Sequence, residues 1–378
     1  MIRDIDLLSI VLQTPGALAP IVWGQPGIGK SARMRQLAAS LDLHLETVIA
    51  SIRDPSDFGG LPMPENGHGI RLEPPSWAVR LAAKGKGIAF FDEASCAPPA
   101  VQAAMLRPIL EGAVGDLQLP PTVRFVSAAN PPDQAAAGWD LSPPLANRFV
   151  HLSWTTPTVD QWTDWLTGDD TAAGKAISIN PERWASQFSQ AKALIAAFLR
   201  RRAHLCEDIT KVTGRFPLAY ATPRTWECAT RLLASCRATG TDEAILPLIA
   251  GTLGEAIAIE FCTWLRANDL PDPEELLKNP DLWKPDPKQP DRAFAVCLAV
   301  TAAALDGGPD LPKRKRHDRW HACWRVLEKA LPLGKELVAI SARKLANGKV
   351  KPEMGEVSPA VRAIIGQLKD VVVAAGMS

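Results

Sequence analysis

The chain has 378 residues, of which 47% are hydrophobic and 22% are charged, and its formal net charge is +1. This is the composition of an ordinary soluble protein, long enough for two to three domains and a sizeable core. The near-zero net charge gives no broad field for binding polyphosphates, so nucleic acid is not favoured as the main partner. No run of about twenty apolar residues occurs, so we expect no membrane span.

The cysteines and the first residues bear on the compartment. The seven cysteines are scattered and form no Cys-x-x-Cys pair, which argues against a structural zinc site and for a reducing environment. The segment Met1-Ile2-Arg3-Asp4-Ile5-Asp6 carries two acids where a signal peptide would have basic charge and then a long apolar run. We therefore expect a cytoplasmic protein.

The first motif along the chain is a glycine-rich loop between an expected strand and an expected helix. The apolar run Ala19–Trp23 leads into Gly24-Gln25-Pro26-Gly27-Ile28-Gly29-Lys30-Ser31, and apolar residues at helical spacing continue to Leu41. In such a loop backbone N–H groups surround phosphates, the lysine reaches the outer phosphates and the hydroxyl ligates Mg²⁺. The helix N-terminus would face the anion. These residues predict a nucleoside triphosphate site.

A buried strand ending in two acids is the second motif. Gly87-Ile88-Ala89-Phe90-Phe91 suits a strand covered on both faces of a parallel sheet, and Asp92 and Glu93 follow at its carboxyl end. Asp92 would hold the Mg²⁺ shell, and Glu93 would orient and polarise the water that attacks the γ-phosphate. The alternative is a strand followed by a solvated acidic turn.

Three further polar positions follow predicted elements. A strand at 123–129 ends at Asn130, whose amide could hydrogen-bond the water or the γ-phosphate, although Asn before Pro is also a turn signal. Arg148 stands at the mouth of another short strand and could reach a neighbouring subunit's nucleotide. Pro223 suits a first helical turn and places Arg224 near that helix N-terminus. Either arginine could instead be an ordinary surface residue.

The order of these motifs, over about residues 1–260, resembles the AAA+ ATPases and specifically their MoxR-like branch. The resemblance implies an α/β AAA+ core, with a parallel sheet and crossover helices, followed by a helical lid. It also implies ATP and Mg²⁺ as cofactors and a ring-shaped homo-oligomer, which we expect to be a hexamer. A partner with a von Willebrand factor A domain is implied as well.

The same resemblance assigns a role to each motif. Residues Gly24 to Ser31 correspond to Walker A, Asp92 and Glu93 to Walker B, Asn130 to sensor 1 and Arg224 to sensor 2. The trans-acting arginine finger is expected to be Arg148, with Arg107 in the helix after Walker B as the other candidate.

A segment between the first and second motifs resembles another feature of that branch. Residues 51–62 look like the family's Pro-x-Asp-x-x-Gly loop, and Glu65-Asn66-Gly67 reads as a hairpin turn. Such a hairpin would be the helix-2 insert of the MoxR-like branch. It could equally be a surface loop without a role.

Composition shifts suggest four segments. Residues 1–153 alternate strand-like and helix-like runs, 154–266 are helical and would form the lid, and 267–291 are rich in Pro and Asp and read as an extended linker. Residues 292–378 return to a helical pattern to which no chemistry can be assigned. The basic run at 313–317 lies just before a helix and is better explained as a solvated charge run than as a nucleic-acid site.

The function expected from the sequence is Mg²⁺-dependent ATP hydrolysis in an oligomeric ring, coupled to remodelling or activation of a protein client. Two alternatives stay open. One is a ring motor acting on nucleic acid, and the other is a nucleotide-gated scaffold with little turnover.

Overall fold

The computed structural model describes residues 2–16, 18–65, 69–131, 139–167, 177–207, 219–267, 270–305 and 311–347, with 361, 362, 364, 366 and 368 further on. They form two compact units, which are described separately. One comprises Met1–Pro181 and Leu205–Ile259, and the other Glu182–His204 and Glu260–Ser378. Within the described ranges, no helix is long and apolar enough to cross a membrane.

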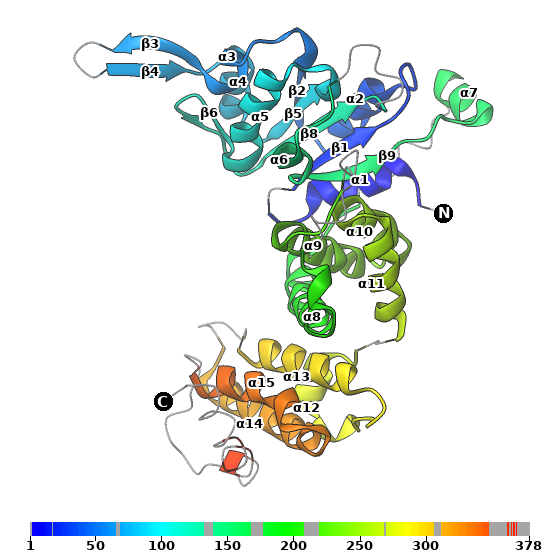
Figure 1. Cartoon of the computed structure of the whole chain (residues 1–378), viewed down its shortest axis with the longest axis vertical. Coiled ribbons are helices and arrows are strands. Elements are labelled where there is room, and N and C mark those ends of the chain that lie inside the picture. The colour runs from blue at the N-terminus through cyan, green and yellow to red at the C-terminus, as the bar shows by residue number, and fades with distance from the viewer. Residues whose placement is uncertain are drawn as a thin grey trace. The chain divides into compact units, whose positions relative to one another are not determined.

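The first unit is built on a five-stranded sheet whose neighbouring strands are all parallel. The strand order is β2-β5-β8-β1-β9. In chain order the strands are β1 (Ala19–Trp23), β2 (His44–Ile49), β5 (Gly87–Asp92), β8 (Val123–Ala129) and β9 (Phe149–Ser153). Figure 1 shows helices lying against this sheet, and the main ones are α1 (Asp4–Gln13), α2 (Lys30–Ser40), α4 (Ser76–Lys84) and α5 (Pro99–Glu111). The predicted α/β fold with a parallel sheet and crossover helices is confirmed.

The strand order matters for the site because β1 and β5 are not neighbours. β8 lies between them, pairing with β1 through Ile21↔Ser127 and with β5 through Phe91↔Ser127. The carboxyl ends of all three strands therefore meet at one edge of the sheet, where open α/β sheets bind their ligands.

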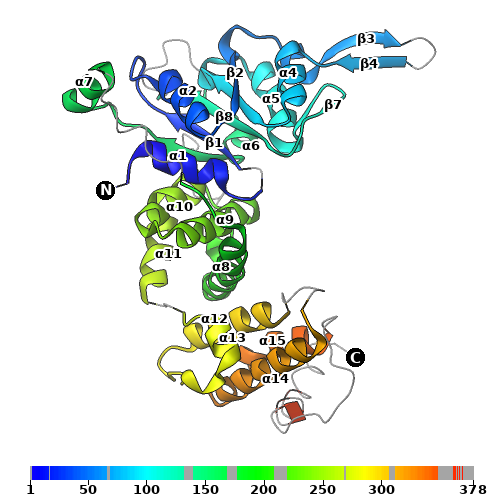
Figure 2. The same cartoon turned by 180° about the vertical axis from the view of Figure 1, so that it is seen from behind.

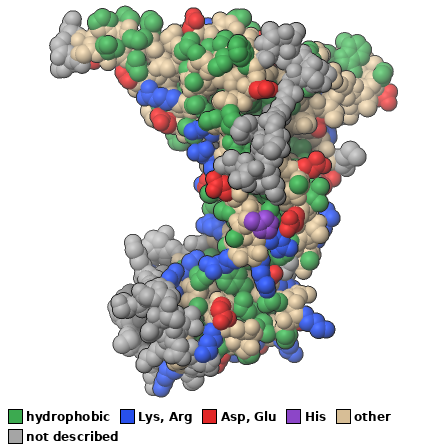
Figure 3. All heavy atoms as spheres, in the orientation of Figure 1, with side chains coloured by type: hydrophobic (Ala, Val, Ile, Leu, Met, Phe, Trp, Pro, Cys, Tyr) green, Lys and Arg blue, Asp and Glu red, His purple; other side chains and the backbone are tan. Residues whose placement is uncertain are grey.

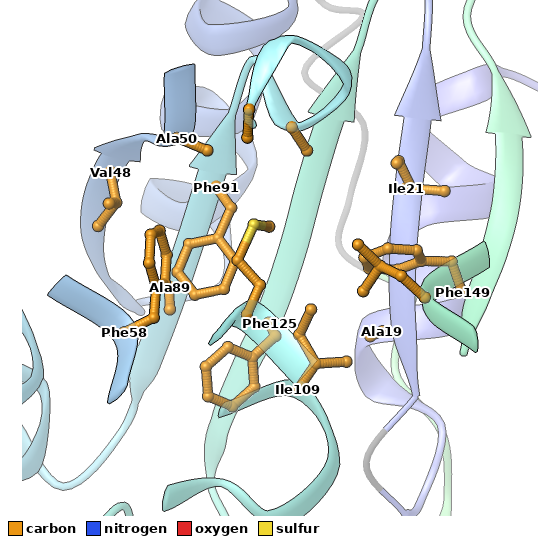
Figure 4. Packing of buried hydrophobic residues seen from close by; sticks show 14 of the residues in the cluster. Ala19, Ile21, Val48, Ala50, Phe58, Ala89, Phe91, Ile109, Phe125 and Phe149 are labelled. Carbon is orange, nitrogen blue, oxygen red and sulfur yellow. The ribbon is translucent and has the colours of Figure 1, made fainter. Parts of the chain in front are cut away.

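Aromatic packing fixes the carboxyl half of β5. Phe91 is fully buried and meets Phe58 edge-on, with ring centroids 5.2 Å apart. Trp77 packs against the same ring from α4 at 5.7 Å. Phe125 of β8 lies 5.8 Å from it (Figure 4). Burying one such ring stabilises the fold by about 1.5–3 kcal/mol. The residues that follow Phe91 are thus carried on a rigid strand.

A two-stranded hairpin extends from this unit, formed by β3 (Leu61–Glu65) and β4 (Gly69–Glu73). The strands pair antiparallel from Leu61↔Glu73 to Glu65↔Gly69, and both views show them projecting from the sheet and its helices (Figures 1 and 2). The predicted Asn66-Gly67 turn lies outside the described residues. The hairpin base is tied to the small β6 (Ala113–Val114) and β7 (Leu117–Gln118) ladder, because Leu72 N donates to Asp116 Oδ2 at 2.8 Å.

The remaining elements of the first unit are short or helical. They are η1 (Ala50–Ile52), α3 (Ser56–Gly59), η2 (Ala94–Cys96), α6 (Pro143–Ala146), α7 (Val159–Thr167), η3 (Ala203–Leu205, which ends in this unit), α9 (Pro223–Thr239), η4 (Asp242–Ala244), α10 (Ile245–Leu253) and the start of α11 (Glu255–Ala267). α9 begins with a capping box, in which Thr222 Oγ1 and Thr225 Oγ1 each accept from the other residue's backbone N–H.

The second unit is helical throughout its described residues. It holds α8 (Pro181–Arg201), the rest of α11, α12 (Pro273–Lys278), η5 (Pro280–Leu282), α13 (Pro290–Leu305), α14 (Lys313–Ala330), η6 (Leu331–Leu333) and α15 (Lys335–Asn347). Arg319 of α14 forms two hydrogen bonds to the Glu274 carboxylate of α12 and a third to Ala303 O of α13, at 2.7 Å.

Two local expectations differ from the structure of this unit. The segment 267–291 is not an extended linker where it is described, because Asp272 caps α12 by accepting from Glu274 N and because Leu276 and Trp283 are buried. The prolines suggested a linker, but Pro273 and Pro290 occupy first turns of helices, where proline is favoured. The basic run beginning at Lys313 does not precede a helix but forms the first turn of α14. The two units also divide the predicted lid, since α8 groups with the later helices.

Candidate nucleotide site at the carboxyl edge of the sheet

The glycine-rich loop joins the end of β1 to the start of α2. Gly27 and Gly29 have φ of +80° and +86°, a region that side-chain-bearing residues rarely adopt. A Cβ built on either glycine would meet nothing within 4 Å, so the loop is open on that side. α2 begins at Lys30 with Gly29 as its N-cap and with no side-chain capping bond. The loop therefore presents open space to a helix N-terminus, an arrangement that suits phosphate oxygens.

Lys30 points back over this loop. Its Nζ donates to Gly24 O at 2.7 Å, to Gln25 O at 3.1 Å and to Asn130 Oδ1 at 2.8 Å. Partial burial lowers the pKa of Lys30 from its usual value, while the charge of Asp92 opposes that shift. The ammonium group is thus held at the strand ends, between the loop and Asn130.

A hydroxyl and a carboxylate meet beside the lysine. Ser31 Oγ donates to Asp92 Oδ2 at 2.7 Å, although the two residues belong to α2 and β5. Oxygen atoms of this kind are the ligands that Mg²⁺ takes in nucleotide sites. The pair could hold a magnesium ion, which is the role that the sequence suggested for these two residues.

Glu93 follows Asp92 in an unusual backbone conformation. With φ of 57° it is one of two described non-glycine residues in the left-handed region, Asp42 being the other. Its N–H donates to Asp92 Oδ1 at 3.0 Å, and its Oε2 accepts a hydrogen bond from Ser51 Oγ of η1, just after β2. Backbone strain of this kind is concentrated at functional sites. Here it turns the Glu93 side chain away from Asp92 and toward β2.

Asn130 lies between the glycine-rich loop and the segment that follows the acidic end of β5. Its backbone N–H and C=O contact Ser95 Oγ at 3.3 and 3.4 Å, and its side chain accepts from Lys30. β8 places it there because this strand lies between β1 and β5. The five predicted positions Lys30, Ser31, Asp92, Glu93 and Asn130 thus lie together.

Arg148 lies at the amino end of β9, whereas the glycine-rich loop lies at the carboxyl ends of the strands. It precedes β9, whose first residue Phe149 pairs with Ala19, whereas its last residue Ser153 pairs with Trp23 next to the loop. Because a strand rises about 3.3 Å per residue, Arg148 is roughly 15–20 Å from the loop of its own chain. That span exceeds the length of an arginine side chain.

Arg224 lies close to Arg148 rather than to the loop. Thr222, the N-cap of its helix, donates to Asn147 Oδ1 at 3.0 Å, and Asn147 Nδ2 donates to Tyr220 O at 3.3 Å. Burial and, after it, the charge of Arg224 lower the pKa of Arg148. Among the described residues, neither arginine forms an ion pair with an acid, and Arg148 Nε is buried without a hydrogen-bond partner. Two adjacent guanidinium groups without an acid are suited to an anion.

Arg107 is placed differently. It lies on α5, where its Nε is 3.5 Å from Glu111 Oε2 one turn along the same helix. An acid of its own helix therefore already neutralises part of its charge.

Two contributing residues had no role assigned from the sequence. Ser51 contacts Glu93 and Ser95 contacts Asn130, each from an element other than its partner's strand. Ser95 follows the buried apolar strand β5, and this position near a strand end is the signal that could have identified it. Ser51 follows β2, which alternates polar and apolar residues, and no local signal marks it.

Comparisons with known proteins give the following. No family model matches the chain, and no curated protein matches it. One similar solved structure, described only as a candidate ATPase from Cytophaga hutchinsonii, is 16% identical over 66% of this chain and 80% of that one, with a TM-score of 0.42. Another, a full-length MCM homolog from Methanopyrus kandleri, is 18% identical over 69% of this chain and 53% of that one, with a TM-score of 0.36.

Proposed function

We propose that this chain is a Mg²⁺-dependent ATPase of the AAA+ type. The observation that carries the proposal is the meeting of Lys30, Ser31, Asp92 and Asn130 at one edge of the sheet, joined by hydrogen bonds of 2.7–2.8 Å. They come from three elements far apart in sequence, and each is the residue type that phosphoryl transfer requires. Mg²⁺ bound at Ser31 and Asp92 would neutralise charge that develops on the phosphate oxygens.

In this proposal each side chain has a separate task. Lys30 leaves its loop carbonyls and contacts the outer phosphates. Glu93 accepts the proton of the attacking water, and Asn130 orients that water or a γ-phosphate oxygen. Positioning and charge stabilisation supply most of the catalysis, since phosphoryl transfer asks for little covalent chemistry from the protein.

Arg148 and Arg224 complete the site of a neighbouring copy. The β9 register supports this assignment, because Arg148 lies roughly 15–20 Å from its own loop. Rigid guanidinium groups from a second subunit would meet the charge that grows on the γ-phosphate. The active form is then a homo-oligomeric ring, for which we propose six subunits and a cytoplasmic location.

We further propose that hydrolysis remodels or activates a protein client, as in the MoxR-like branch, with a von Willebrand factor A domain protein as partner. The β3–β4 hairpin supports a protein contact. Its apolar side chains Leu61, Met63 and Ile70 are 54%, 43% and 70% exposed, and hydrophobic side chains gather on the projection in Figure 3. A two-stranded ribbon without a core is marginally stable alone, so a partner that covers it would stabilise it.

Nucleotide binding tests the proposal at its first step. Calorimetric titration with ATP and Mg²⁺ should show binding to the wild-type chain and its loss in Lys30→Ala, while both proteins unfold in a cooperative transition. Arg107→Ala is the matched control, because it removes one exposed cation from the same unit and should keep the affinity within about twofold. Equal ATP affinity of wild type and Lys30→Ala would contradict the proposal.

A further inference from the structure

α7 is a formed helix without a packed face. It begins with a capping box, since Thr158 N donates to Gln161 Oε1 at 3.0 Å and Gln161 N donates to Thr158 Oγ1 at 3.3 Å. None of its nine residues is buried. Trp162 is 50% exposed and Trp165 42%. Isolated helices shorter than about 12–15 residues are marginal in water, so α7 needs a contact that covers its tryptophans.

The segment that carries α7 is attached to the rest of the unit. Trp154 N donates to Trp23 O at 2.7 Å, and Thr155 donates from N and Oγ1 to Asp4 Oδ2 at 2.9 and 3.0 Å. Both views show α7 standing apart from the sheet beyond this attached segment (Figures 1 and 2). The segment at Trp154 and Thr155 is therefore fixed to the unit, whereas α7 itself is not packed against it.

A cavity of about 950 Å³ lies between α7 and the glycine-rich loop. Its walls include residues 25–29 of the loop, residues 2–6 at the start of the chain, and Trp162 and Trp165 of α7. Phosphates held by the loop would place the attached ribose and base in the neighbouring space. Indole rings suit such an occupant because every base has a π-face that stacks on an aromatic side chain.

We propose that the base of the bound nucleotide stacks on Trp162 and Trp165, and that α7 closes over the nucleoside when it binds. This inference rests on the proposed function, since the loop must hold the phosphates for the base to reach α7. A nucleoside is favoured over a second copy of the chain as the occupant, because both tryptophans line the same cavity as the phosphate-binding loop.

The test compares two ligands that differ in the nucleoside. Calorimetry should measure the affinities of ATP and of inorganic tripolyphosphate, each with Mg²⁺, for wild type and for a Trp162→Ala, Trp165→Ala double variant. Loss of base stacking should weaken ATP binding about 5- to 100-fold. Tripolyphosphate, which has no base, should bind both proteins within twofold. Leu166→Ala is the control, because Leu166 is an exposed apolar residue of α7 that does not line the cavity.

Each outcome bears on a different statement. Equal ATP affinity of the double variant and wild type would overturn the stacking of the base on the tryptophans and would leave the proposed function standing. A change in the oligomeric mass of the double variant would not alter that conclusion. Equal weakening of ATP and tripolyphosphate would also overturn it, since the tryptophans would then act on the loop or the fold. Failure of wild type to bind either ligand would overturn the proposed function together with it.

Discussion

Ser51, in η1 just after β2, donates a hydrogen bond to the carboxylate of Glu93, which follows β5. β2 and β5 are neighbours in the sheet, with Ile49 paired to Asp92, so the contact joins two adjacent strand ends. The left-handed backbone of Glu93 directs its side chain to this partner. One oxygen of the proposed water-activating acid is therefore already occupied.

Removal of the Ser51 hydroxyl should release that acid. We expect Ser51→Ala to raise basal ATP hydrolysis about fivefold. The hydrogen bond stabilises the Glu93 carboxylate in a position away from the attacking water by roughly 1 kcal/mol, and the variant loses that stabilisation. Ser51→Thr keeps the hydroxyl and should behave as wild type in a steady-state phosphate-release assay. Slower turnover in Ser51→Ala would mean that Ser51 holds Glu93 in its working position instead.

Mixing of inactive variants should reveal a site shared between copies. Arg148→Ala and Lys30→Ala are each expected to be nearly inactive, because guanidinium groups of this kind contribute on the order of 10³ in rate. Co-assembly should restore part of the turnover, since one interface in a mixed ring has both residues intact. Arg224→Ala should complement Lys30→Ala in the same way.

Arg107→Ala provides the contrast for that experiment. Its ion pair with Glu111 within α5 predicts a fall in turnover of less than about threefold. If mixed rings assemble and show no turnover while Arg107→Ala alone is inactive, Arg107 is the residue that acts in trans.

The hairpin should serve a partner and not the chemistry. If the proposed von Willebrand factor A domain partner binds the hairpin, Met63→Asp combined with Ile70→Asp is expected to weaken its capture, while basal hydrolysis stays within about twofold. DNA and RNA should also leave hydrolysis within about twofold at moderate salt. Salt-sensitive stimulation by DNA that disappears when residues 313–316 are neutralised would favour a nucleic-acid motor.

His151 should make the fold sensitive to acid. It is half-buried in β9, accepts from Trp23 Nε1 at 2.9 Å and contacts Ala146 O at 2.9 Å, and desolvation lowers its pKa to about 4. The unfolded chain binds a proton near pH 6.5 and the folded chain does not, so stability falls as the pH drops from 6.5 toward 4. Between pH 7 and 5 this loss should reach about 2 kcal/mol.

Denaturant unfolding at the two pH values measures that loss. His151→Gln cannot take up a proton in this range, so its stability should change less between pH 7 and 5 than that of wild type. The same pH dependence in both proteins would assign the acid sensitivity to other groups.

The site residues that follow predicted strands could be identified from the sequence. The contacts that depend on which strands and helices are neighbours could not. Asp92 and Asn130 stand at the ends of apolar strands, Lys30 and Ser31 follow the loop that leaves a third strand, and parallel strands bring such ends together. The contact of Ser51 with Glu93 depends on β2 being the neighbour of β5, and the closeness of Arg148 and Arg224 depends on α9 docking at Asn147. Neither relationship leaves a pattern in the local sequence.

In the helical unit, amino-acid composition alone also failed to predict the local structure. Its proline-rich segment was expected to be extended, yet Leu276 and Trp283 are buried and Pro273 starts α12. Proline in a first helical turn and proline in a linker look alike until the packing of the neighbouring apolar residues is known.

The most direct test of the account is the steady-state hydrolysis of ATP by purified Glu93→Gln protein, measured beside its ATP affinity. The amide keeps the shape of the side chain and leaves Ser31 and Asp92 intact, but it cannot accept a proton from water. We predict unchanged binding of ATP with Mg²⁺ and a fall in turnover of about 10²–10⁴-fold. Hydrolysis at the wild-type rate would contradict the account, because Glu93 would then have no part in the reaction.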